Sequence, residues 1–190
     1  MRWHSVVIPA LAVTGAIFVG LWNSQMVAGW KTFSDPTTRI VIEYPPDLIN
    51  QPITDTDRQD KIIFRGTEKP GDRPVLITLR YEDGLRVTTE LAKKDLLDLL
   101  VENSDRAHPD RFPEYQKISE RRLDLAGKKA AEILFTYKRP AGERIKQRFL
   151  IVVRDNDLAV YLAAQTQEAD FAVLDQKYFD RLFSAVRFDE

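Results

Sequence analysis

Three residues near the middle of the chain, Asp105, His108 and Asp110, carry side chains that bind metals or transfer protons. They lie in the polar segment SDRAHPDR. The other histidine, His4, precedes a long apolar segment, so His108 is the single candidate for a general base in the rest of the chain. The spacing fits no defined zinc or calcium site, and a solvated polar loop is the simpler interpretation. A metal-dependent enzyme that uses His108 is therefore kept as an alternative hypothesis.

The sequence lacks other common signatures of catalysis. No two glycines stand in a G-x-G arrangement, and no serine lies in G-x-S-x-G. Asp55, Asp57 and Asp60 are spaced like the start of a calcium loop, but the turn glycine is missing and the twelfth position is Gly66 instead of glutamate. The absence of cysteine excludes disulfides, thiolate metal sites and cysteine nucleophiles. We therefore expect no enzyme, no catalytic residue, no metal ligand and no cofactor.

The composition is that of a chain that folds in water. Of its 190 residues, 44% are hydrophobic and 30% are charged. The formal net charge is −1, so no global field attracts nucleic acid, and we expect no nucleic-acid partner. Between Arg2 and Lys31 there is no Lys, Arg, Asp or Glu, which sets the N-terminal segment apart.

This N-terminal segment predicts a transmembrane anchor over residues 1–29. From Ser5 to Trp22 the chain has 18 consecutive uncharged residues, and a spanning helix needs about 17–25. Trp3 and Trp22 are 19 positions apart, about 28 Å along a helix, and tryptophan prefers the two edges of a bilayer core about 30 Å thick. The alternative is a cleaved signal peptide, because VAG at residues 27–29 suits a signal peptidase.

Charge and small residues predict the orientation and the contacts of this anchor. Arg2 precedes the span, so we expect a single-pass protein with a cytoplasmic N-terminus. The domain of residues 30–190 would then lie in the periplasm or lumen, beside an inner or photosynthetic membrane. Ala12, Ala16 and Gly20 repeat every four residues and form a stripe where another membrane helix can pack, although spanning helices are rich in such residues anyway.

Hydrophobic periodicity predicts the elements of the first half of this domain. Alternating apolar residues indicate strands over 38–44, 61–66 and 73–84. A helix is predicted over 88–103, capped by Thr88 or Thr89. A loop is predicted over 104–115, because Pro109 and Pro113 interrupt it.

The second half predicts a run of antiparallel strands and a closing helix. The strands cover 115–125, 129–139, 144–154 and 158–166, and their turns are too short for parallel crossovers. The closing helix starts at Asp170, and a last strand covers 184–188; the apolar side of the helix consists of Phe171, Leu174, Tyr178 and Leu182. Some strands are apolar on both faces, so the sheet must be covered twice. The predicted fold class is α+β: an α-β-α sandwich with a central twisted, mainly antiparallel sheet, preceded by one transmembrane helix.

Basic residues gather around the turn at residues 140–143. On a strand, Arg144, Lys146 and Arg148 point the same way, and Lys138 and Arg139 lie across the turn. These five form a candidate basic patch for an acidic partner or lipid headgroups. An ordinary charged hairpin, which also blunts the sheet edge, is the alternative.

Three segments resemble PsbP-like domains, and the likeness covers nearly all of residues 30–190. They are TFSDPTTRIVIEYPPDL, LDLAGKKAAEILFTY and DFAVLDQKYFDRLFSAVRF. Two positions depart from the pattern: Thr38 and Arg39 replace the usual Gly-Phe, and Leu48 or Ile49 stands where tryptophan is frequent. The resemblance implies an α-β-α sandwich and a non-catalytic accessory role beside a larger membrane complex.

We therefore expect a structural or assembly subunit of a photosynthetic or respiratory membrane complex, with integral membrane proteins and the lipid bilayer as partners. Tethering raises the effective concentration, so the interface of the domain with its partner can be weak. An alternative is an envelope domain that binds a small ligand in a pocket between sheet and helix.

Overall fold

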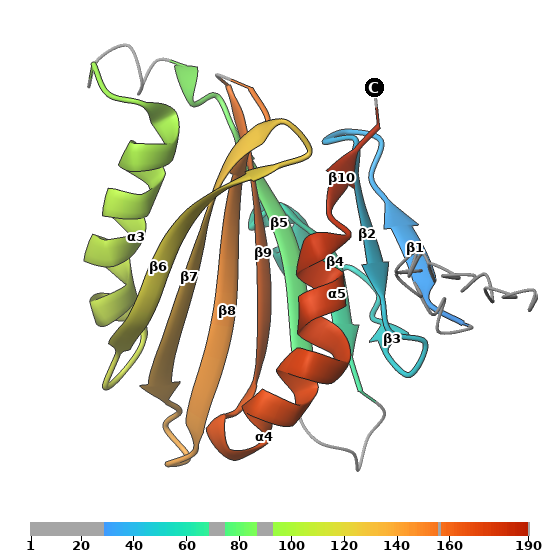
Figure 1. The fold of residues 1–190 in the computed structure, drawn as a ribbon, viewed down its shortest axis with the longest axis vertical. Helices are drawn as coiled ribbons and strands as arrows, with labels where there is room; N and C mark the ends of the chain where they lie inside the picture. Colours follow the sequence, from blue (N-terminus) through green and yellow to red (C-terminus); the bar gives the residue numbers. More distant parts are fainter. Residues whose placement is uncertain (1–28, 69–74, 87–92, 156, 190) are drawn as a thin grey trace, which may run out of the picture.

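The computed structural model describes residues 29–68, 75–86, 93–155 and 157–189, arranged in three layers (Figure 1). The middle layer is a seven-stranded sheet in the order β3-β4-β5-β9-β8-β7-β6. All of its neighbouring strands pair antiparallel. Its strands are β3 (Ile49–Asn50), β4 (Ile62–Thr67), β5 (Leu76–Asp83), β6 (Gln116–Leu125), β7 (Lys128–Lys138), β8 (Arg144–Val153) and β9 (Leu158–Gln167).

One long helix, α3 (Leu96–Arg111), covers one face of this sheet and packs on β7 and β8. The other face is covered by a C-terminal helix and a small three-stranded sheet. The helix consists of α4 (Glu168–Leu174), a π-helical turn η1 (Asp175–Phe179) and α5 (Asp180–Ser184). The small sheet has the order β1-β2-β10 and consists of β1 (Lys31–Ser34), β2 (Ile40–Tyr44) and β10 (Arg187–Phe188).

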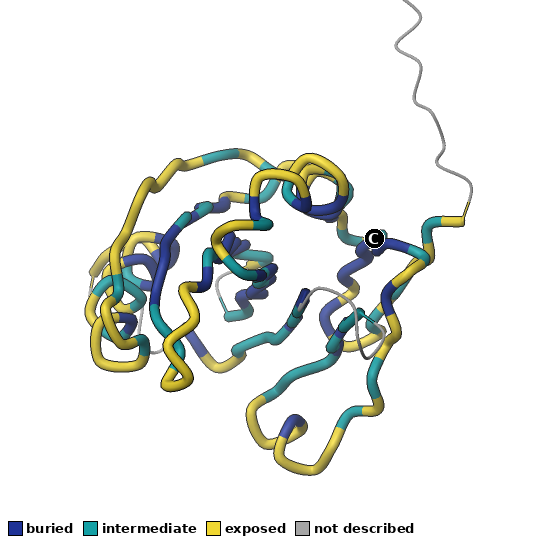
Figure 2. The backbone as a smooth tube through the Cα atoms, turned by 90° about the horizontal axis from the view of Figure 1, so that it is seen from below, coloured by how far each residue is buried: buried dark blue, intermediate teal, exposed yellow. Residues whose placement is uncertain are grey.

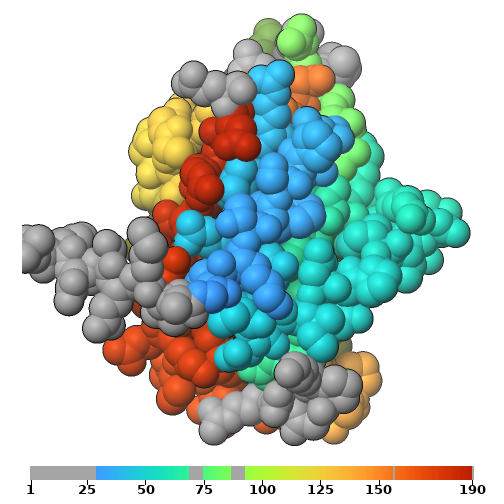
Figure 3. Space-filling view, turned by 90° about the vertical axis from the view of Figure 1, so that its right-hand side faces the viewer, coloured from blue at the N-terminus to red at the C-terminus, as the bar shows by residue number. Residues whose placement is uncertain are grey.

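The small sheet brings the two ends of the described chain together. Figure 3 shows this side of the molecule, with the N-terminal strands in blue beside C-terminal residues in red. Ile40 and Ile42 of β2 are fully buried and join the core between the layers. The guanidinium of Arg181 lies 4.4 Å from the ring centre of Trp30, so the closing helix also contacts the first described residues.

The central strands are buried on both sides because both faces are covered (Figure 2). On β7 and β8, Ile133 and Phe149 belong to the core beneath α3, whereas Leu150 and Val152 belong to the core beneath the C-terminal helix. Alternate residues of a strand therefore belong to two separate hydrophobic cores. The predicted antiparallel run and the double cover are confirmed.

The turn between β6 and β7 shows how short connections set this topology. Ala126 and Gly127 both have positive φ, 51° and 74°, as a two-residue type I′ hairpin turn requires. The N–H of Gly127 also donates to the Asp124 carboxylate at 2.8 Å. This turn fixes the register in which Leu125 faces Lys128.

The prediction for the long helix was wrong at both ends. The helix begins after Asp95, whose carboxylate accepts from the N–H of Leu97 at 3.0 Å, and Thr88 and Thr89 lie outside the described residues. It continues through the predicted loop to Arg111, with Pro109 inside. Proline is tolerated because it lies in the last turn of the helix, where its missing N–H removes only the bond to the Asp105 carbonyl.

The prediction of one sheet was incomplete. Residues 38–44 and 184–188 contribute strands to the small sheet, not to the main one. A short helix α1 (Asp55–Gln59) precedes β4, and the Asp57 carboxylate forms its capping box with Thr54 instead of a calcium loop. The predicted buried residues of the closing helix are confirmed: Phe171, Leu174, Tyr178 and Leu182 are all at most 5% exposed.

Among the described residues, no helix combines the length and the apolar character needed to cross a bilayer. The predicted anchor, with Trp3, Ala12, Ala16, Gly20 and Trp22, lies outside the described residues.

Candidate ligand-binding site

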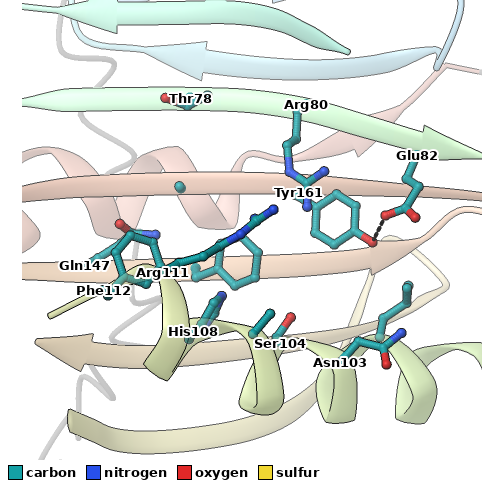
Figure 4. Close-up of a pocket in the computed structure, with 14 residues that line it drawn as sticks. Thr78, Arg80, Glu82, Asn103, Ser104, His108, Arg111, Phe112, Gln147 and Tyr161 are labelled. Atoms are coloured by element: carbon teal, nitrogen blue, oxygen red, sulfur yellow. Dashed lines mark hydrogen bonds between the residues drawn. The ribbon is translucent and has the colours of Figure 1, made fainter. Parts of the chain in front are cut away.

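A cavity lies between α3 and the seven-stranded sheet (Figure 4). Its volume is about 470 Å³, within the range of about 300–1,000 Å³ typical of small-molecule sites. Its floor comes from β5, β9 and β8, and its wall from the last three turns of α3. Ala107 on the wall and Ala163 on the floor are too small to fill the space between them.

The cavity exists because α3 lies off-centre on its face of the sheet. Its side chains Leu97, Leu100 and Val101 are buried over β7 and β8, which leaves β5 and β9 less covered. Ion pairs join its outer side to the sheet edge: Lys117 of β6 binds Asp105 at 2.8 Å, and Arg122 binds Asp98 at 3.1 Å. The opposite side of the helix faces the cavity.

His108 lies at one end of the cavity and continues the buried stripe of α3. It is 7% exposed, and four rings surround it at centroid distances of 4.9–5.5 Å: Phe112, Tyr115, Phe135 and Phe149. Burial lowers the pKa of His108 to about 4, with Asp105 opposing this and Arg111 and Arg80 adding to it. His108 is therefore neutral at pH 7, and its Nδ1 is buried without a hydrogen-bond partner among the described residues.

The floor of the cavity holds an arginine, a tyrosine and a glutamate on neighbouring strands. Tyr161 donates its hydroxyl to the Glu82 carboxylate at 2.8 Å. The guanidinium of Arg80 lies 4.1 Å from the centre of the Tyr161 ring, as cation–π stacking requires. Burial, and then the charge of Glu82, raise the pKa of Tyr161, so its hydroxyl stays a proton donor.

Two further polar side chains have hydrogen-bonding capacity that the protein does not use. Gln147 of β8 is 5% exposed and lines the cavity, and among the described residues no hydrogen bond to its amide occurs. Arg111, in the last turn of α3, extends into the same space as Arg80 (Figure 4). Neither arginine has a carboxylate within ion-pair distance among the described residues. Arg111 is exposed and Arg80 is half-buried, so both guanidinium groups and the Gln147 amide are available to a ligand.

The metal hypothesis for Asp105, His108 and Asp110 gains no support from the geometry. Asp105 pairs with Lys117, whereas His108 points into the aromatic cluster. Within the described ranges, no group of three His, Asp or Glu side chains is placed to hold a metal ion.

The five residues of the candidate basic patch each contact other residues of the chain. Lys138 binds Glu114 at 3.1 Å, Arg139 lies 3.7 Å from Glu143, and Arg144 binds Glu168 at 3.1 Å. Lys146 and Arg148 do point the same way as Arg144, but toward the C-terminal helix, where Lys146 lies 4.8 Å from the Phe171 ring centre. These cations are therefore neutralised or covered within the chain, and a partner role for them stays a prediction.

Arg148 is the clearest example of a basic residue that the chain itself neutralises. Its side chain is 8% exposed, and its two Nη atoms contact three carboxylates: Glu132 at 2.8 Å, and Asp175 and Asp180 at 2.7 Å each. Its guanidinium also lies 4.5 Å from the ring centre of Phe183. Arg148 thus fastens the C-terminal helix to the sheet.

Sequence reasoning found His108 but missed Arg80, Gln147, Arg111 and Tyr161. One available signal was Gln147, a polar residue between Ile145 and Phe149 on a strand face that must be buried. The polar series Thr78, Arg80 and Glu82 was visible on alternate positions of β5, but it is equally typical of a strand face exposed to water.

No protein-family model matches the sequence, and no curated protein matches it. Several solved structures are similar. The solution structure of cyanobacterial PsbP (CyanoP) from Synechocystis sp. PCC 6803 has a TM-score of 0.61 and 11% identity, and the match covers 90% of this chain and 99% of that one.

Two further similar structures come from other settings. LpqN, involved in cell envelope biogenesis of Mycobacterium tuberculosis, has a TM-score of 0.56 and 12% identity, with 85% of this chain and 91% of that chain covered. The Ran-binding protein Mog1p of Saccharomyces cerevisiae has a TM-score of 0.53 and 10% identity, with 84% and 95% covered. At such identities the likeness shows the fold alone. The chain therefore has a PsbP-like fold, as the sequence resemblance predicted.

Proposed function

We propose that this chain is a non-catalytic accessory domain that acts by binding, and that the cavity beneath α3 is its small-ligand site. One observation carries the proposal: His108 lines the cavity with its Nδ1 buried and without a hydrogen-bond partner among the described residues. Unpaired buried polar groups lower stability, and a ligand that pairs with them offsets that cost.

The same groups are poorly arranged for catalysis. A histidine with a pKa of about 4 is a weak base at neutral pH, and its Nδ1 bonds to no hydroxyl or carboxylate of the described residues. Tyr161, the buried hydroxyl in the cavity, has a raised pKa and already donates to Glu82. The proposal of a binding role agrees in kind with Mog1p, which is a Ran-binding protein.

Filling the cavity tests this proposal. Ala163→Phe on the floor and Ala107→Phe on the wall each place a ring in the space, whereas Val173→Phe adds the same ring to an exposed position on α4. A small-molecule fragment collection is titrated against all forms by NMR. We expect binders of the parent chain to lose binding in both cavity variants and to keep it in Val173→Phe. If no fragment distinguishes the cavity variants from the control, the proposal is wrong.

The apolar N-terminus supports a second candidate function. We propose that residues 1–29 anchor the domain by one transmembrane helix, with the N-terminus in the cytoplasm and residues 30–190 in the periplasm or lumen beside an integral membrane complex. The support is the uncharged stretch Ser5–Trp22 between Trp3 and Trp22, together with a fold shared with a cyanobacterial PsbP. The complex would be photosynthetic or respiratory.

The intact mass of the chain in its native membrane, measured together with what co-purifies after gentle detergent extraction, tests this candidate. We expect residues 1–29 to be retained and integral membrane proteins to co-purify. Ala16→Leu lies in the stripe of small residues and should release the partners, whereas Ala10→Leu lies off the stripe and should retain them. A mature chain that starts at Trp30, or one that always migrates alone, contradicts the candidate.

A further inference from the structure

The charges of the cavity indicate what kind of ligand it takes. We infer that the site beneath α3 binds a small planar organic anion, such as an aromatic carboxylate, with its charge between Arg80 and Arg111 and its flat body against the aromatic floor. This inference rests on the proposed ligand-binding role and adds the chemical class of the ligand.

The first step is that the two arginines carry charge that nothing nearby neutralises. Arg80 comes from β5 and Arg111 from α3, and both extend into the space between these elements (Figure 4). Among the described residues, no carboxylate lies within ion-pair distance of either guanidinium. Elsewhere in the chain, the buried Arg148 contacts three carboxylates. Arg80 is half-buried and Arg111 is exposed, so the cavity presents positive charge that is available to a ligand.

The second step concerns the one acidic group of the lining. Glu82 accepts the hydroxyl of Tyr161 at 2.8 Å, which orients its carboxylate toward that hydroxyl. With His108 neutral at pH 7, the lining carries two positive charges and one negative charge. Because this excess lies in a partly enclosed site between a helix and a sheet, it attracts an anion more strongly than the same charge in open water.

The third step concerns the shape of the floor. The guanidinium of Arg80 lies over the Tyr161 ring at 4.1 Å, which holds this charge in a defined place. The Tyr161 ring in turn lies nearly parallel to Phe149, with 16° between the rings and 5.9 Å between their centres. Ala163 also lines the floor, and its small side chain leaves space above the sheet. A flat apolar body fits such a surface, and a carboxylate at its edge can reach a guanidinium fork.

The unpaired amide of Gln147 completes the match, because an amide can donate to a carboxylate oxygen. Inorganic anions would use the arginines but not the rings, and neutral aromatics would use the rings but not the arginines. The two features together favour a ligand that has both.

The experiment uses two probes that differ in charge and share a ring system: 2-naphthoate and 2-naphthamide. Each is titrated by calorimetry into residues 1–190 and into Arg111→Gln and Arg80→Gln. Arg121→Gln is the control, because Arg121 is 65% exposed and pairs with Glu132, and neither residue lines the cavity. We expect 2-naphthoate to bind the parent chain at least about tenfold more tightly than 2-naphthamide.

Each cavity variant should weaken 2-naphthoate about tenfold and leave 2-naphthamide within about twofold, and Arg121→Gln should change neither. Arg80→Lys keeps the charge but not the flat stack, so it should give a smaller loss than Arg80→Gln. The far-UV and near-UV circular dichroism of every variant is compared with that of the parent chain. If Arg80→Gln alters the spectra, the exposed Arg111→Gln decides the outcome.

The outcomes separate this inference from the proposed function. If both probes bind equally and the arginine variants have no effect, the anion inference is overturned, while loss of binding in Ala163→Phe would still support the cavity as a ligand site. If neither the probes nor any fragment binds the parent chain in an Ala163-dependent way, the inference and the proposed function both fail.

Discussion

The arginines on the two faces of the central sheet differ in whether they form ion pairs with carboxylates. Under the C-terminal helix, Arg148 is 8% exposed on its side chain and contacts three carboxylates. Under α3, Arg80 and Arg111 line a cavity, and no carboxylate of the described residues lies within ion-pair distance. Arg148 is buried and needs these partners, because an unpaired buried charge is very costly, whereas Arg80 is half-buried and Arg111 is exposed. Under our proposal, the first face serves stability and the second keeps charge available for a ligand.

The largest effect on the free energy of unfolding is expected when the paired arginine, Arg148, is replaced. Arg148→Leu removes the buried cation that Glu132, Asp175 and Asp180 share, and it also removes the contact to Phe183. We expect a loss of roughly 3–5 kcal/mol in the free energy of unfolding, measured by urea denaturation. Arg121→Leu is the control, since Arg121 also pairs with Glu132 but is 65% exposed, and its loss should stay below about 1 kcal/mol. Equal losses would show that Arg148 has no special structural role.

The second largest effect should come from His108 on the opposite face. Burial holds its pKa near 4, whereas in the unfolded chain it is near 6.5, so between these values the unfolded state binds more protons. Stability from this group is therefore complete above pH 6.5 and decreases as the pH falls toward 4, by roughly 2–3 kcal/mol.

The pH dependence of unfolding in His108→Phe checks this prediction. The variant should lack that decrease between pH 6.5 and 4, whatever its absolute stability. The carboxylates Asp57, Asp83 and Asp95 have lowered pKa values, so their contributions begin to be lost as the pH falls toward 3.8, equally in the parent chain and the variant. Parallel profiles for the parent chain and the variant would contradict a neutral, buried His108.

Two tyrosines on the α3 face differ in whether their hydroxyl groups have a hydrogen-bond partner, and replacing each by phenylalanine tests that difference. Tyr161→Phe removes a hydroxyl that donates to Glu82, and it should lower the free energy of unfolding by about 1 kcal/mol. Tyr115→Phe removes a buried hydroxyl that has no partner among the described residues, so it should be neutral or slightly stabilising. Thermal unfolding of both variants gives the comparison, and a loss in Tyr115→Phe as large as in Tyr161→Phe would contradict it.

The smallest effect is expected at the ion pairs that join α3 to the edge strand. Arg122 pairs with Asp98 at 3.1 Å, and both side chains are substantially exposed. Arg122→Gln should therefore change the free energy of unfolding by no more than about 0.5 kcal/mol. A larger change in urea denaturation would mean that these pairs, and not the buried leucines of α3, set the position of the helix.

Much of the fold could be predicted from local pattern. The alternation in RPVLITLRY placed Ile77 and Leu79 in the core, and the short turns required antiparallel neighbours. Pro109 misled the prediction for α3, because a proline favours a break whereas the packing of His108 among four rings keeps the helix intact to Arg111. Strands 38–44 and 184–188 were recognised, but local pattern cannot say which sheet a strand joins.

The site was much less predictable than the fold. His108 was found by its chemical type alone, and its type suggested a base or metal ligand, whereas its surroundings make it neutral. Arg148 and Arg80 looked alike as basic residues on strands that also carry apolar positions. Only the helix that covers each of them distinguishes the two.

The sequence by itself determined the strand and helix content, the antiparallel run and the need for two covering layers, because these follow from the spacing of apolar residues and from turn length. The tertiary structure alone decided that α3 lies over β7 and β8 and leaves β5 and β9 open, which creates the cavity. It also decided which arginines meet carboxylates. The physical reason is that side-chain charge and burial depend on neighbours far away in the chain, and periodicity carries information only about neighbours nearby.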